Sequence, residues 1–292
     1  MSCSGESVGS LPTVDEPLPE LVSELGVRRD SFSRLHSAYA PMYPLWTNGS
    51  TKDRSIVLPP GTQVDTREEP WVIPVGTYFF KSFAYQGEPV ETRVMRLMPE
   101  GEWEYAVYVW NGDDATLANI DRSALVPVEG GALEHGIPSR RDCRTCHESN
   151  LGTDIIGFRA LQLNQGTLDD LSADGIFSDP VTNEELTASS DLERQVLGYF
   201  EGNCTHCHHG EAGPNASFDL RYESARANIV GQATESSGAP VGERIVPGAP
   251  EESVLRRALT REEEFAMPPL GVQRRDDDAI ADLDAWIRML DR

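Results

Sequence analysis

Two pentapeptides of the form Cys-x-x-Cys-His constrain this chain more than any other feature, and they occupy residues 143–147 and 204–208. The pattern is the attachment site of c-type haem. The two thiols bond to the haem vinyl groups, and the two-residue gap places both sulfurs on one turn of backbone. The histidine follows directly, so its imidazole can bind the iron as an axial ligand. Two copies in a chain with five cysteines predict two covalently bound haem c groups, held by Cys143, Cys146, His147, Cys204, Cys207 and His208.

Zinc and redox chemistry are the alternatives for these cysteines. Four thiolates could hold a zinc ion, and a single Cys-x-x-Cys pair could be a redox centre. A zinc site does not explain why a histidine follows each pair at once, and the gap from Cys146 to Cys204 is longer than in a compact zinc ribbon. A thioredoxin-like pair needs a βαβ context, which neither motif has. Haem attachment is the stronger interpretation.

The charge balance limits the partners. The formal net charge is −23, which argues against nucleic-acid binding because that function needs a basic surface. The same charge disfavours adsorption to anionic lipid. It can steer a redox protein with a basic docking face toward the chain, although it can equally serve only to keep the protein soluble.

Covalent haem implies export. Bacteria attach haem outside the cytoplasmic membrane, so we expect a periplasmic or cell-surface protein whose signal peptide is absent from this sequence. No apolar run is long enough to cross a membrane. Cys3, followed by Ser4-Gly5-Glu6-Ser7, fits the lipid anchor of a bacterial lipoprotein, the alternative being an unremarkable thiol in a tail. Any contact with the membrane is expected only through that anchor.

Hydrophobic patterning predicts an α+β chain. An N-terminal antiparallel β-sandwich or barrel-like domain is expected to precede a mainly α-helical domain that carries both motifs. The expected parts are a flexible tether (1–30), a β-rich domain (31–132), a first haem segment (133–190) and a second haem domain (191–292). Expected strands are Ser55–Leu58, Trp71–Pro74, Thr77–Tyr85, Val90–Met98, Trp103–Trp110 and Ala124–Val128, and expected helices are Leu18–Leu25, Asp191–Glu201 and Ala279–Leu290.

The second motif is followed by a candidate ligand for the other face of its iron. Met267 lies in Ala266-Met267-Pro268-Pro269-Leu270, 59 residues after His208 and before the terminal amphipathic helix. A thioether ligand favours ferrous iron and raises its potential. This stretch, with Pro247-Gly248-Ala249-Pro250 and the final helix bearing Trp286, resembles the class I cytochrome c family. A core methionine is the alternative for Met267.

The ligand opposite His147 is less clear from the sequence. No methionine lies between Met98 and Met267, so a ligand must come from upstream or be absent. Met95 and His135 are the preferred candidates, with Met98, His36 and Met42 as others. Since strand residues alternate between faces, only one of Met95 and Met98 can enter a haem pocket. An open or water-bound iron remains an alternative.

Most of the chain from about residue 40 resembles a family of largely uncharacterised bacterial dihaem c-type cytochromes with an N-terminal β domain. The resemblance rests on Pro44–Lys52, Pro74-Val75-Gly76-Thr77, Lys81-Ser82-Phe83, Glu91-Thr92-Arg93, Tyr108-Val109-Trp110-Asn111, Ile156-Gly157-Phe158 and Leu161-Gln162-Leu163-Asn164. It implies an exported electron-transfer protein working between periplasmic or cell-surface redox partners. It supplies no substrate.

An electron carrier is therefore expected rather than a catalyst. The chain has no Ser-His-Asp pattern, no His-Glu-x-x-His and no phosphate loop. The alternative is a dihaem oxidoreductase of the peroxidase type, with an open site at the first haem. A third interpretation makes the aromatic-rich β domain a docking module that brings the haems to a partner.

Overall fold

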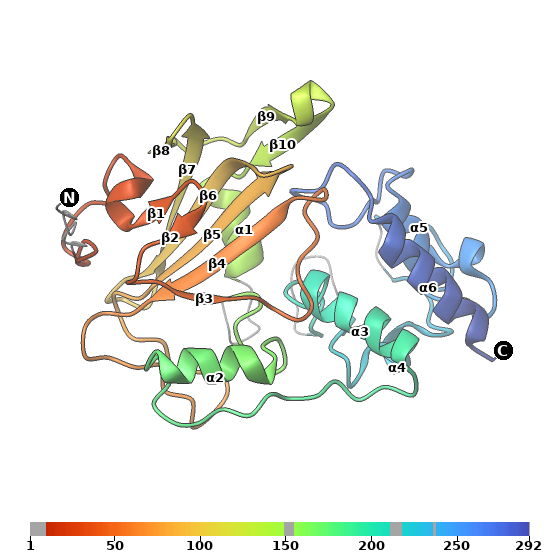
Figure 1. Ribbon diagram of the computed structural model, residues 1–292. Helices are drawn as coiled ribbons and strands as arrows, with labels where there is room; N and C mark the ends of the chain where they lie inside the picture. Colours follow the sequence, from red (N-terminus) through yellow and green to blue (C-terminus); the bar gives the residue numbers. More distant parts are fainter. Residues whose placement is uncertain (1–9, 149–154, 211–217, 236–237, 292) are drawn as a thin grey trace.

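The computed structural model describes residues 10–148, 155–210, 218–235 and 238–291 (Figure 1). Cys3 lies outside these residues, so its proposed lipid anchor stays a prediction. Within the described residues the largest sheet is antiparallel, has six strands and follows the chain order from β3 to β8. Its strands are β3 (Ser37–Tyr39), β4 (Thr51–Val57), β5 (Tyr78–Tyr85), β6 (Glu88–Leu97), β7 (Trp103–Asn111) and β8 (Asp114–Leu117).

Short strands and helices complete the molecule. Two small antiparallel pairs are β1 (Val27–Arg28) with β2 (Ser31–Phe32), and β9 (Ala124–Val128) with β10 (Leu133–Ile137). The α-helices are α1 (Arg140–His147), α2 (Gln165–Ala173), α3 (Asp191–Asn203), α4 (Ala225–Ile229), α5 (Val254–Thr260) and α6 (Asp277–Met289). Single 3-10 turns are η1 (Val22–Leu25), η2 (Glu129–Gly131) and η3 (Pro250–Glu252). No helix among the described residues is long and apolar enough to cross a membrane.

The long strands and the two strongly patterned helices fall where the sequence places them, and two shorter segments do not. Trp71–Pro74 forms no strand; Val72 makes only an isolated bridge to Asp65, because the prolines at both sides of the segment cannot donate to a ladder. The helix expected over Leu18–Leu25 is reduced to the η1 turn. Pro19 removes a backbone donor from its first half.

The class is α+β as expected, but the large sheet does not pack on a second sheet of similar size in the described part of the chain. One face is covered by the N-terminal segment, with Val22 and Leu25 packed on Phe80 and Tyr108. The other face packs on the segment that follows the first motif, where Phe158 meets Phe79 with ring centroids 5.1 Å apart. Chain segments thus take the place of a second sheet.

The helical part has its own core, which lies apart from the sheet. In this core α3 packs against α6 (Figure 1). Phe200 of α3 and Leu283 and Trp286 of α6 are almost completely buried there. Tyr43, from the segment before β4, packs into this same core. Conversely, Leu168 and Leu171 of α2 join the core beneath the sheet. The hydrophobic cores therefore tie the β part to the helical part, and the predicted domain bounds stay a prediction.

Candidate haem cavity

One large cavity lies between the sheet and the helical part. Its volume is about 1060 Å³, at the top of the roughly 300–1,000 Å³ range usual for a small-molecule pocket. Both Cys-x-x-Cys-His motifs line it, although they begin 61 residues apart in the sequence. The predicted residues in its wall are Cys143, Cys146, His147, Cys204, Cys207, His208, Met95 and Met267. The fold thus brings both motifs and both candidate methionines to one space.

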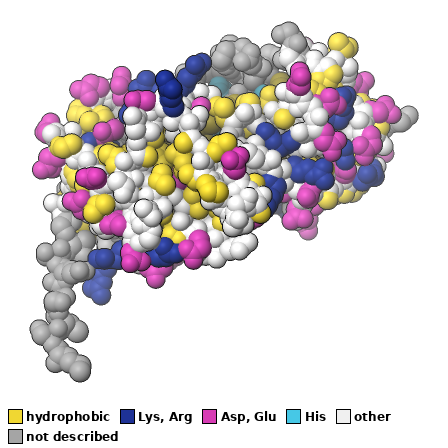
Figure 2. Space-filling view, turned by 90° about the horizontal axis from the view of Figure 1, so that it is seen from above, with side chains coloured by type: hydrophobic (Ala, Val, Ile, Leu, Met, Phe, Trp, Pro, Cys, Tyr) yellow, Lys and Arg dark blue, Asp and Glu magenta, His cyan; other side chains and the backbone are white. Residues whose placement is uncertain are grey.

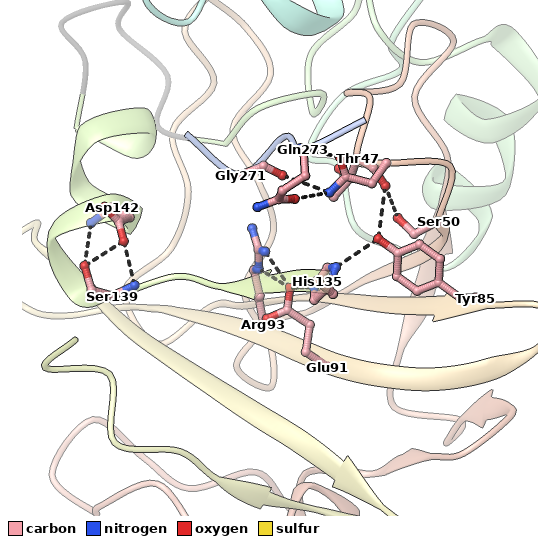
Figure 3. A network of polar contacts seen from close by, with 11 residues as sticks. Thr47, Ser50, Tyr85, Glu91, Arg93, His135, Ser139, Asp142, Gly271 and Gln273 are labelled. Carbon is pink, nitrogen blue, oxygen red and sulfur yellow. Dashed lines mark hydrogen bonds and ion pairs between the residues drawn. The ribbon is translucent and has the colours of Figure 1, made fainter. Parts of the chain in front are cut away.

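The first motif forms the C-terminal half of helix α1. Ser139 caps this helix: its hydroxyl oxygen accepts from the backbone N–H of Asp142, while the Asp142 carboxylate accepts from the Ser139 backbone N–H at 2.8 Å (Figure 3). This reciprocal cap fixes the start of the helix. The helix in turn presents His147 to the sheet, with its ring centroid 5.9 Å from that of Tyr105 on β7.

The second motif follows directly from the end of α3. Ser190 caps the start of this helix through the backbone N–H of Glu193. At its other end the backbone N–H groups of Cys207 and His208 both donate to the carbonyl of Cys204, which closes the motif into a tight turn. His208 lies against Phe218 in a tilted arrangement, with ring centroids 4.5 Å apart. Burial lowers the pKa of His208 to about 4, so its imidazole is neutral, the form that binds iron.

The loop that carries Met267 is held to the β part by Asn48. The Asn48 side chain is fully buried; its oxygen accepts from the backbone N–H groups of Gln273 and Arg274 at 2.7 and 2.9 Å, and its amide donates to the Gln273 side chain. The Met267 backbone N–H donates to the carbonyl of Ala258. Met267 itself lines the cavity and is 40 % exposed. Sequence reasoning did not single out Asn48, although it lies in one of the family-like stretches.

The four motif cysteines are free thiols. Burial raises the pKa of Cys143 to about 11 and that of Cys204 to about 12, so both are protonated at neutral pH. Nowhere in the described part of the chain do three His, Cys, Asp or Glu side chains gather in the way that a bare metal ion requires. The geometry therefore does not favour the zinc alternative, which needs four thiolates around one centre.

The candidate ligands for the face opposite His147 differ in whether they line the cavity. Met95, on β6, is buried and lines the cavity, whereas Met98, Met42 and His36 do not line it. His135 is completely buried outside the cavity wall, and both of its ring nitrogens are engaged. Nδ1 lies 3.0 Å from the Tyr85 hydroxyl and Nε2 lies 2.7 Å from a Glu91 oxygen (Figure 3). Met95 is thus the candidate that the fold brings to the haem space.

His206 lies between the cysteines of the second motif and is buried. His206 and His209 are exposed to only 8 and 4 %. His206 lines the cavity, and its Nδ1 is buried without a hydrogen-bond partner among the described residues. The Nδ1 of His208 is in the same state. The buried imidazole of His208 beside Cys204 and Cys207 forms a donor set that fits covalently bound haem.

The arginines divide between the cavity and the surface. Arg244 lines the cavity over the Phe218 ring, at 4.6 Å from the centroid. Arg221 pairs with Asp219 instead and is not part of the wall. The cluster of Arg140, Arg141 and Arg144 on α1 also lies outside the wall. Of these five arginines, only Arg244 lines the cavity.

The second motif and its methionine loop define a cytochrome c-like region. A protein-family model described as Planctomycete cytochrome C matches residues 204–271, which span the motif and the Met267 loop. A region of this family implies covalently bound haem c and a haem-based role in electron transfer. Comparisons with curated proteins and with solved structures find no match.

Proposed function

We propose that this protein is an exported electron-transfer protein with two covalent c-type haems, one at each motif. The observation that supports this most is the shared cavity: both Cys-x-x-Cys-His motifs open into the same space of about 1060 Å³. Haems attached there would lie near each other, so that electrons could pass between them inside the protein. Bound haem supplies the one-electron chemistry, and the protein supplies the ligands, the burial and the counter-charges.

The proposed axial ligands are His147 with Met95 at the first iron and His208 with Met267 at the second. Each histidine follows its thiol pair at once, and each methionine lines the same cavity from a different element. Met95 comes from the sheet, so the β part completes the first haem site. This role for strand β6 favours a shared pocket over a β domain that acts only as a docking module.

The proposed partners are other redox proteins with a basic docking face, in the periplasm or at the cell surface. The net charge of −23 would attract such a partner. On the face seen in Figure 2, acidic side chains spread over both ends of the molecule, around a more hydrophobic area. A charged rim around an apolar centre is a suitable surface for short-lived contact between redox proteins.

An oxidoreductase of the peroxidase type is the second candidate, and the sparse ligand set at the first motif is the observation behind it. His135 is held by Tyr85 and Glu91, so Met95 is the first candidate ligand on that side. If Met95 does not bind iron, the first haem has an open position for a small ligand.

Haem stoichiometry and low-temperature EPR test these proposals on protein made with the haem-attachment machinery. We expect a mass increase of two haems and two low-spin ferric signals. A single haem, or none, would contradict the dihaem proposal. A high-spin signal from one of two haems in the wild-type protein would instead favour the oxidoreductase. Conversion of one low-spin signal to high spin in Met95→Ala would assign Met95 as the ligand.

A further inference from the structure

A row of three cationic side chains crosses the sheet beneath the first motif. Arg54 on β4 is the register partner of Lys81 on β5, and Lys81 is the register partner of Arg93 on β6. Directly opposed residues of an antiparallel sheet point to the same face and stand next to each other. All three side chains line the cavity. Like charges in such a row repel one another, so the arrangement is costly without a counter-charge.

The protein supplies only part of that counter-charge. Glu91 pairs with Arg93, whose Nε donates to it at 2.9 Å, and also with His135 (Figure 3). The Phe83 ring lies beneath Lys81 and Arg93, at 5.0 and 4.5 Å from its centroid. Across the described ranges, no carboxylate forms an ion pair with Arg54 or Lys81. Two cations of the row thus face the cavity without an anionic partner, in a chain with 48 acidic residues.

The electrostatics of Lys81 show the same lack of a negatively charged partner. Burial, followed by the neighbouring charges of Arg54 and Arg93, holds the pKa of Lys81 well below its usual value. An anion placed against the row would reverse this effect by stabilising the charged amine. The row is therefore arranged to receive negative charge from inside the cavity.

The row acts electrostatically on groups of both motifs in the cavity. Arg93 acts electrostatically on both Cys143 and Cys146, and Lys81 acts on Cys146. The corresponding neighbour of His208 in the second motif is Arg244. Lys81 also acts on His206 of the second motif, so the row lies where the two motifs approach each other.

We propose that the Arg54–Lys81–Arg93 row binds carboxylates inside the cavity, and that these are the propionates of a haem held covalently there. This inference rests on the proposed dihaem function. It assigns to the sheet the charge compensation of a haem in the cavity, a role that the arginines of α1, outside the cavity wall, do not fill. A freely exchanging small carboxylate is the other source of the same chemistry.

The chain has only two lysines, Lys52 and Lys81, and substituting each gives a matched pair of variants. Lys52 lies on the neighbouring row of the same sheet, donates to the carbonyl of Leu45 and is not part of the cavity wall. Lys81→Met should lower the reduction potential of one haem, since removal of a nearby positive charge disfavours the reduced state. We expect about a tenfold change in the reduction equilibrium constant, or about 59 mV for one electron.

The controls separate the possible outcomes. Haem stoichiometry is measured first, and a count below two in the wild-type protein would contradict the dihaem function itself. With two haems present, Lys81→Arg should leave both potentials close to wild type, and Lys52→Met should change them less than Lys81→Met does, because Lys52 lies outside the cavity wall. If Lys81→Met loads no haem, Arg54→Gln carries the same expectation at the other end of the row. Unchanged potentials in both variants would overturn the proposal while the dihaem function stands.

Acetate titration at constant ionic strength distinguishes the two carboxylate sources. Propionates are part of a covalently held group and cannot exchange, so we expect no saturable change in the wild-type potentials or spectrum. A saturable shift that Lys81→Met abolishes would show that the row takes a free carboxylate, and would overturn its assignment to the haem.

Discussion

At the scale of single residues, Met267 is the residue expected to tune the proposed second haem. Its sulfur is the candidate axial ligand opposite His208, and a thioether raises the potential of a haem by favouring ferrous iron. Met267→Ala should lower the potential of the haem at the second motif and remove the sulfur-to-iron charge-transfer band from the ferric spectrum. Met289→Ala is the control, because Met289 is 64 % exposed at the end of α6 and does not line the cavity. Equal potentials for Met267→Ala and the wild type would exclude Met267 as a ligand.

At the scale of elements, the contact between α3 and the segment around Tyr43 sets the position of the second motif. A Cβ atom at Gly198 would lie 2.2 Å from the Tyr43 ring, and one at Gly202 would lie 2.1 Å from the Tyr43 carbonyl oxygen. Alanine at either position should lower the free energy of unfolding by about 1–3 kcal/mol, the usual cost of overpacking. Tyr43→Ala should rescue Gly198→Ala, whose clash is with a side chain, but not Gly202→Ala, whose clash is with backbone. Equal rescue in a denaturant double-mutant cycle would contradict this packing.

At the scale of the whole molecule, the net charge of −23 should govern the rate of electron exchange with charged partners. Charge steering changes association rates by roughly 10–1,000-fold and weakens as salt screens it. The rate of oxidation by a small cationic oxidant should therefore fall with ionic strength, while that by an anionic oxidant should rise. Stopped-flow kinetics with the two oxidants at matched driving force measures this difference. The same salt dependence for both would show that electrons leave through a locally uncharged surface.

Most of what could be predicted depended on residues that are close together in the sequence. The two motifs, the Met267 loop and the capped, strongly patterned helices α3 and α6 were predictable because the responsible residues are neighbours in sequence. The long strands β5, β6 and β7 were predictable because Gly and Pro turns bound them. His135 was a poor candidate ligand for the opposite reason: its engagement by Tyr85 and Glu91 depends on partners 50 and 44 residues away.

The sequence by itself determined the chemistry: two thiol pairs, each followed by a histidine, commit the chain to covalent haem, since spacing within one turn is a local property of the backbone. Only the tertiary structure decided that both motifs share one cavity, that Met95 rather than Met98 faces it, and that Asn48 holds the loop of Met267. It also placed Arg54, Lys81 and Arg93 side by side. These arrangements depend on strand register and on contacts between distant segments, which are set by the packing of the whole chain and leave no periodic signal in any one part of it.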